Sequence, residues 1–289
     1  MFSTLMATDW QLLHESATGP VAGARVQLHR AVQAVAAVGE AYVPPEPDSG
    51  HLTAQWLSEP GLLAGLPTDT EPALRLGLDP QRLALELLDY RGSIVGRIEL
   101  AGRTMNDAYA WLETALVERL GPEQARPLGR PDAPVPSTGL GADEPFELRT
   151  VERFAELARW YANAALLFNE LRETEGNTTP TRCWPHHFDI AFLIRLDPDD
   201  TSEQARAVGV GMTPGDDAYS EPYWYVAPWP YPVDVELPQL PHGSWHTAGW
   251  TGAVLQGSQM VRTDAASQRA QVQEFAHAAI TACRELLGG

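Results

Sequence analysis

Apolar residues recur every three to four positions in four segments of the chain, the spacing expected for one buried face of an α-helix. We expect helices over residues 21–38, 104–120, 151–168 and 272–286. Thr104 and Asp107 have the spacing of a capping box, which predicts that the second helix begins at this point. Gly121, before a proline, and Gly176 are expected to end the second and third helices.

Short apolar runs between these helices predict β-strands. We expect strands at 51–57, 82–88 and 93–100, and again at 188–196, 206–212, 221–226 and 245–255. The order helix, strands, helix thus occurs twice, with strands grouped between helices. This order predicts an α+β fold of two similar helix–strands–helix units, in which antiparallel sheets are flanked by amphipathic helices, and it suggests an internal duplication.

A proline- and glycine-rich stretch separates the two halves. Residues 121–147 contain six prolines and four glycines. Because proline fixes φ and lacks a backbone donor, this stretch is expected to run extended over the surface. The predicted organisation is an N-terminal α+β unit (1–121), a linker (122–147) and a C-terminal α+β unit (148–289).

The charged residues exclude several chemistries. All 20 basic residues are arginines, so the chain cannot form a lysine Schiff base, a Walker A loop or a Ser-x-x-Lys hydrolase site. The formal net charge of −18 makes nucleic acids and anionic membrane surfaces unfavourable partners.

The sequence lacks the signals of secretion, membrane insertion and disulfide bonding, and this predicts the cellular location. The first basic residue is Arg25, so the N-terminal residues lack the positive region of a signal peptide, and no apolar run is long enough for a membrane span. Two cysteines, Cys183 and Cys283, are too few for a disulfide framework. We therefore expect an acidic, cytoplasmic, bacterial protein.

The chain also resembles a bacterial family described as domain of unknown function 5996. The resemblance lies in the Pro-Phe-Glu entry to a long helix at 145–147, the Phe-Asp-Ile-Ala run at 188–191 and the Tyr-Ser-x-Pro-Tyr-Trp-Tyr segment at 219–225. It covers nearly the full chain and implies the fold and the compartment, but no particular activity. Family members carry small residues where His186 and His187 stand, so a role for this pair rests on the present sequence alone.

Potential metal ligands lie in a region rich in aromatic residues. Five of nine tryptophans and four of eight histidines fall between residues 184 and 250. On a strand, His187 and Asp189 would point to one face, and with His246 they would supply two imidazoles and a carboxylate for a divalent metal, with Glu221 as a further oxygen donor. The alternatives are histidines with a structural role, which we favour, and a catalytic histidine without a metal.

The aromatic residues of the same region predict a binding surface. Rings beside carboxylates suit a sugar or a planar ligand, because the rings stack and the carboxylates accept hydrogen bonds from hydroxyl groups. The candidate ligand-binding residues are Trp184, Glu221, Tyr223, Tyr225, Trp229 and Trp245. The alternative, which we favour, is that these rings fill the core of a small sheet.

These features lead to two hypotheses from different functional classes. The first is a small-molecule-binding protein or metal-assisted enzyme with an aromatic-lined His/Asp/Glu pocket in the C-terminal half. The second is a non-catalytic interaction or scaffold protein whose aromatic core is purely structural. The sequence leaves open the ligand, the reaction, the catalytic residues, the oligomeric state and whether the protein is an enzyme.

Overall fold

The computed structural model describes residues 9–14, 21–130, 141, 143–200, 202, 204–260 and 262–288. These residues contain four α-helices and eleven β-strands, which confirms the predicted α+β class. The chain divides into two compact units. The first unit comprises Pro20–Ala158 and Arg182–Phe188, and the second comprises Arg159–Thr181, Asp189–Gly289 and the described part of Ala7–Gly19.

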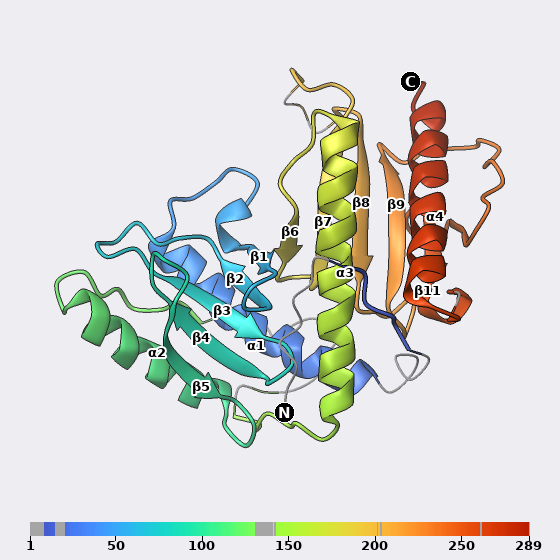
Figure 1. Ribbon diagram of the computed structural model, residues 1–289. Coiled ribbons are helices and arrows are strands. Elements are labelled where there is room, and N and C mark those ends of the chain that lie inside the picture. Colours follow the sequence, from blue (N-terminus) through green and yellow to red (C-terminus); the bar gives the residue numbers. More distant parts are fainter. Residues whose placement is uncertain are drawn as a thin grey trace. The chain divides into compact units, whose positions relative to one another are not determined.

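The first unit is an antiparallel sheet with two helices on one face (Figure 1). Its strands follow the order β6-β1-β2-β3-β4-β5. The elements are α1 (Val21–Tyr42), β1 (Ala54–Leu57), β2 (Leu62–Gly65), β3 (Arg75–Asp79), β4 (Ala84–Leu88), β5 (Ile94–Glu99), α2 (Met105–Leu120) and β6 (Arg182–Trp184), with a short 3-10 helix at Gly50–Leu52.

Glycines in this sheet mark where the helices approach it. A Cβ atom at Gly65 would lie 3.0 Å from Val35 of α1, and one at Gly96 would lie 3.4 Å from Trp111 of α2. Strand alternation and the register place both glycines on the same face of the sheet, so α1 and α2 cover that face. The predicted capping box is confirmed, since Thr104 accepts from the Asp107 N–H and Asp107 accepts from the Thr104 N–H.

The second unit has the sheet order β10-β11-β9-β8-β7, again antiparallel. Two helices, α4 and the part of α3 that follows Ala158, pack on one face of this sheet (Figure 1). The elements are α3 (Val151–Glu175), β7 (Asp189–Arg195), β8 (Ala207–Thr213), β9 (Tyr223–Trp229), β10 (Ser244–His246), β11 (Gly252–Gln256), a 3-10 helix (Gly257–Gln259) and α4 (Ala265–Leu286).

The core of the second unit is built around Trp224 on β9. Its ring centroid lies 5.7 Å from that of Trp160, 5.8 Å from that of Trp10 and 5.9 Å from that of Phe168. Only 2% of Trp224 is exposed. Part of the aromatic concentration in the sequence is therefore core, as the structural alternative predicted.

The two units differ in strand order. From β1 to β5 the strands of the first unit follow the chain, whereas in the second unit β11 lies between β9 and β10. The internal duplication suggested by the element order is therefore not confirmed.

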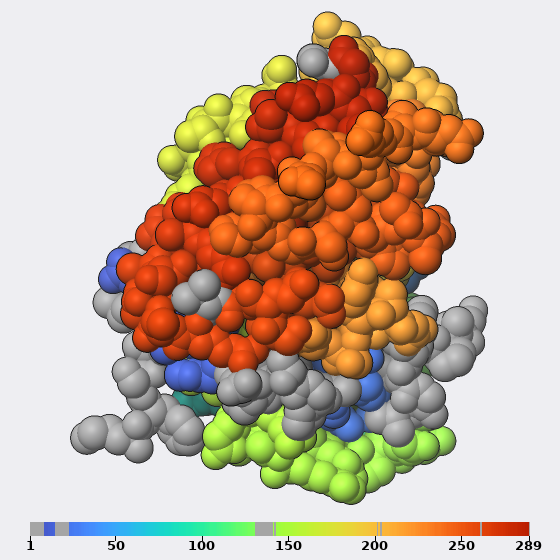
Figure 2. All heavy atoms as spheres, turned by 90° about the vertical axis from the view of Figure 1, so that its right-hand side faces the viewer, coloured from blue at the N-terminus to red at the C-terminus, as the bar shows by residue number. Residues whose placement is uncertain are grey.

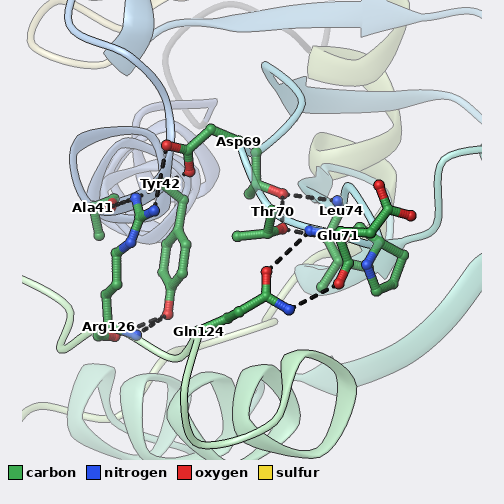
Figure 3. Close-up of polar contacts among 10 residues, drawn as sticks. Ala41, Tyr42, Asp69, Thr70, Glu71, Leu74, Gln124 and Arg126 are labelled. Atoms are coloured by element: carbon green, nitrogen blue, oxygen red, sulfur yellow. Dashed lines mark hydrogen bonds and ion pairs between the residues drawn. The ribbon is translucent and has the colours of Figure 1, made fainter.

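Both ends of the predicted linker are bound to the first unit. The Arg126 N–H donates to the Tyr42 hydroxyl, and the Gln124 amide bonds both the N–H and the carbonyl of Glu71 (Figure 3). At the other end, Arg30 donates to the carbonyls of Gly141 and Glu144. The observed boundary between the units follows Ala158, inside α3, and differs from the boundaries at 121 and 148 expected from composition. Residues 131–140 lie outside the described part of the chain.

In the described segments, every helix is too short or too polar to cross a lipid bilayer.

Candidate functional site

Five aromatic side chains of the second unit form a closed circuit of ring contacts, which we call the ring circuit. Its members, in order, are Tyr219, Tyr223, Tyr225, Trp250 and His246, and His246 contacts Tyr219 again. Neighbouring ring centroids lie 4.5–6.3 Å apart, within the range of favourable aromatic pairs. Each ring therefore has two aromatic neighbours.

Strand geometry places the ring circuit on the face of the sheet opposite α3 and α4. Side chains alternate along β9, so Tyr223 and Tyr225 point away from the face that carries Trp224. The register pairs Tyr225 with Gly211 of β8. A Cβ atom at Gly211 would lie 2.2 Å from Cζ of Tyr225, so the phenol ring can lie over β8 only because residue 211 is glycine.

A second strand glycine supports another ring in the same way. A Cβ atom at Gly252 of β11 would lie 2.4 Å from the Trp250 ring. Trp250 stacks on His246, with ring centroids 4.5 Å apart and an interplanar angle of 27°. Two glycines on neighbouring parts of the sheet thus allow two large rings to lie close to the backbone.

The hydroxyl of each tyrosine in the circuit donates a hydrogen bond to a carboxylate or an imidazole nitrogen. The Tyr225 hydroxyl lies 2.5 Å from Oδ2 of Asp189, and the Tyr223 hydroxyl lies 2.6 Å from Oδ2 of Asp216. Burial, together with these carboxylates, raises the pKa of both phenols well above the ordinary value. Both tyrosines therefore stay neutral and donate hydrogen bonds to the aspartates.

His246 is held by partners on both ring nitrogens. Its Nε2 lies 2.9 Å from the carbonyl oxygen of Ala248, so Nε2 carries a proton and donates to that oxygen. In the neutral ring Nδ1 is then an acceptor, and the Tyr219 hydroxyl, 2.9 Å away, donates to it. Burial and the nearby Asp216 raise the pKa of Tyr219. This arrangement orients the imidazole but leaves neither nitrogen free for a metal ion.

The ring circuit is partly accessible to solvent. Tyr223 is buried, with 4% exposed, whereas the other four rings are half-buried. Asp189 is buried, with 9% exposed, and Asp216 is half-buried. The arrangement therefore offers ring surface and negative charge to a molecule from outside.

The other predicted ligand-binding residues have local structural contacts. Glu221 accepts hydrogen bonds from the N–H and hydroxyl groups of Ser258, and the Trp245 indole donates to the Pro238 carbonyl. Trp229 is 41% exposed and packs against Tyr231. Trp184 belongs to the first unit, where its ring contacts His186.

The strand argument for His187 is wrong. Residues 185–188 form a turn and β7 begins only at Asp189, so the side chains of His187 and Asp189 do not alternate along one strand. His187 is exposed and belongs to the first unit, whereas Asp189 and His246 belong to the second. Among the described residues, no group of three or more His, Cys, Asp or Glu side chains is placed to hold a metal ion. A metal bound by these three residues stays a prediction without support from the structure.

The turn at 185–188 is fixed to α1 by a buried histidine. Nε2 of His29 lies 2.8 Å from the Pro185 carbonyl, and the Gln33 amide donates to the same oxygen. The His29 ring stacks on Phe188, and only 5% of His29 is exposed. Burial lowers the pKa of His29 from 6.5 to about 4.

This pKa predicts how the first unit responds to acid. At pH values between about 4 and 6.5 the unfolded chain binds a proton at His29 that the folded chain does not bind. The contribution of His29 to stability is therefore fully present above pH 6.5 and is lost as the pH falls towards 4. As the pH falls from 6.5 to 4, the free energy of unfolding of the wild type should decrease by about 3 kcal/mol more than that of His29→Gln. Urea unfolding at each pH measures this difference. Replacing the exposed His277 by glutamine should leave the pH dependence unchanged. Parallel pH profiles for wild type and His29→Gln would contradict the prediction.

Two rings of the site, Tyr219 and Trp250, were not among the predicted ligand-binding or metal residues. Both lie in loops next to strands, so no strand periodicity marked them. The available signal was the position of Gly211 and Gly252 inside strand-like runs, since glycine within a strand often marks a close approach.

Two cavities lie away from the ring circuit. One, of about 110 Å³, is lined in the first unit by Gln27, Arg149, Thr150 and their neighbours. The other, of about 10 Å³, lies beside Trp160 in the second unit and has room for about one water molecule. Ligand pockets usually enclose about 300–1,000 Å³, so both are small for an organic ligand.

Comparison with known proteins gives no further assignment: no family model, curated protein or solved structure matches this chain. The resemblance to the domain of unknown function 5996 family therefore stays a prediction.

Proposed function

We propose that the protein binds a small organic molecule on the ring circuit of its second unit. The observation that carries this proposal is the closure of the circuit, in which five aromatic side chains each contact two others. Tyr223 and Tyr225 come from the predicted ligand-binding set, and His246 and Asp189 come from the predicted metal set. In the proposed role, Asp189 orients Tyr225 and contributes charge.

The polar contacts favour binding over catalysis by His246. A general base needs a nitrogen within hydrogen-bond reach of the substrate proton. Both nitrogens of His246 are engaged, one by the Tyr219 hydroxyl and one by the Ala248 carbonyl. The imidazole therefore serves best as a fixed ring surface.

Calorimetric titration of the full chain tests this proposal. Candidate ligands are first selected by ligand-observed NMR from a set of sugars, planar heterocycles, organic cations and organic anions. We expect at least one to bind saturably to the wild type and much more weakly to Trp250→Leu, which removes one wall of the circuit. Trp229→Leu is the matched control, because Trp229 is exposed and lies outside the circuit. Failure of every class to bind, or equal binding to Trp250→Leu and wild type, would reject the proposal.

An interaction role is a second candidate, favoured by one exposed segment. Trp229, Tyr231, Val233 and Val235 are 41–78% exposed, in a stretch where prolines interrupt strand pairing. The segment before β11 lies beside α4 at the surface (Figure 2), where His242 bonds Glu274. If interaction were the only function, Trp229→Ala/Tyr231→Ala would lower the affinity for a partner, and no small molecule would bind the ring circuit.

A further inference from the structure

We infer that the ligand of the ring circuit is an organic cation, of the alkylammonium class. This inference rests on the proposed function, because it names the chemical class that the same site accepts. Three features of the site support it: the arrangement of the rings, the charge beside them and the state of their hydrogen-bonding groups.

The ring arrangement suits a cation. Four of the five neighbouring pairs meet at interplanar angles of 58–77°, so the circuit presents ring faces in several directions. An aromatic face attracts a cation within roughly 6 Å of its centroid, and neighbouring centroids of the circuit lie 4.5–6.3 Å apart, so a cation at the circuit can interact with more than one ring. Aromatic walls of this kind bind quaternary ammonium groups.

The charge next to the rings is negative. Asp216 accepts from the N–H groups of Ala218 and Tyr219 and from the Tyr223 hydroxyl, all of which are neutral donors. Asp189 accepts from Tyr225 on the same face of the sheet. A phenol that donates to a carboxylate also gains electron density on its ring, which strengthens the attraction of that ring for a cation. The net charge of −18 acts in the same direction.

The tyrosine hydroxyls and the imidazole nitrogens of the circuit already have hydrogen-bond partners. The hydroxyls of Tyr219, Tyr223 and Tyr225 donate to His246, Asp216 and Asp189, and the remaining nitrogen of His246 donates to a backbone carbonyl. A sugar needs such groups to read its hydroxyls, and displacing an existing partner costs free energy. An alkylammonium group needs only ring faces and negative potential, so the site favours it over a neutral polyol.

Paired titrations test the ligand class on the full chain. One ligand is choline, and the other is the neutral alcohol in which carbon replaces the ammonium nitrogen, so shape is constant and only charge differs. We expect choline to bind roughly tenfold more tightly than the neutral alcohol, measured by calorimetry or ligand-observed NMR. Trp250→Leu should reduce this preference, whereas Trp229→Leu should preserve it.

A charge variant separates local from global electrostatics. Asp216→Asn keeps the shape of the side chain and one oxygen for the N–H groups of Ala218 and Tyr219, but it removes the charge and places an amide nitrogen beside the Tyr223 hydroxyl. Choline binding should therefore weaken several-fold while binding of the neutral alcohol stays the same. Asp199→Asn makes the same change in net charge at an exposed turn after β7 and should change neither. Circular dichroism of each variant checks that the fold is retained.

Each outcome has a distinct meaning. Equal affinities for choline and its neutral counterpart, or binding of a sugar, heterocycle or anion without binding of choline, would overturn the ligand class and leave the proposed function standing. Absence of binding by every ligand tested would reject both. Equal effects of Asp216→Asn and Asp199→Asn would show that overall charge, and not the ring circuit, attracts the cation, which overturns the inference.

Discussion

Replacing Trp224 by alanine should lower the free energy of unfolding of the second unit by about 4 kcal/mol, since removing a buried tryptophan loses apolar burial and leaves a cavity. Trp224 is 2% exposed and contacts three other aromatic rings from α3 and the N-terminal segment. Its Nε1 atom is buried without a hydrogen-bond partner among the described residues. Trp224→Phe, which keeps a ring and removes this unsatisfied donor, should therefore cost less than about 2 kcal/mol.

Urea unfolding followed by far-ultraviolet circular dichroism measures both effects without relying on tryptophan fluorescence. The matched control is Trp229→Ala, at an exposed position on the same strand, which should change stability by less than about 1 kcal/mol. A Trp224→Ala variant as stable as Trp229→Ala would show that the core of the second unit lies elsewhere.

Replacing Arg97 by methionine should destabilise the first unit by about 3 kcal/mol at neutral pH, because it leaves a buried carboxylate without its cation. Glu86 on β4 is 1% exposed, and Nε and Nη2 of Arg97 lie 2.6 and 2.5 Å from its Oε1 atom. Its Oε2 atom has no hydrogen-bond partner within the described part of the chain. Burial raises the pKa of Glu86 even beside Arg97, so removing Arg97 should raise it further.

The sign of the pH dependence follows from this pKa. In the variant, a raised folded-state pKa means that stability is highest below the unfolded pKa of Glu86 and is lost as the pH rises through the folded value. The deficit of Arg97→Met should therefore shrink on acidification from pH 8 to pH 5. The double variant Glu86→Leu/Arg97→Met, which removes both charges, should recover most of the lost stability. A deficit that is equal in the single and double variants would indicate lost packing instead of an unpaired charge.

The helices were the most predictable part of the fold. Their apolar spacing, the Thr104–Asp107 capping box and the glycines at 121 and 176 located all four to within a few residues at most ends. Strands β2, β3 and β6 were missed, because runs of three to five residues such as Leu62–Gly65 are too short to show a period. Their pairing depends on strands that are distant in sequence, and this information is not local.

The candidate site was predictable in composition but not in arrangement. Tyr225 and Asp189 were both singled out, yet their hydrogen bond depends on the register of β7, β8 and β9, which brings residues 36 positions apart together. The expected alternation extends the strand predicted at 188–196 back to His187, whereas the chain turns at 185–188 with Phe188 at a φ of 56°. Glu86 showed no sign of being buried, since alternation alone cannot tell which strand faces are covered.

The two glycines beneath the rings have a genetic consequence. Every glycine codon is a single base change away from codons for alanine, valine and an acidic residue, and each of these places a Cβ atom where Tyr225 or Trp250 now lies. Random substitution can thus abolish the ring circuit while leaving all five of its aromatic codons intact. In a mutational screen for loss of ligand binding, codons 211 and 252 should be hit as often as those of the rings, although neither residue has a side chain with which to touch a ligand.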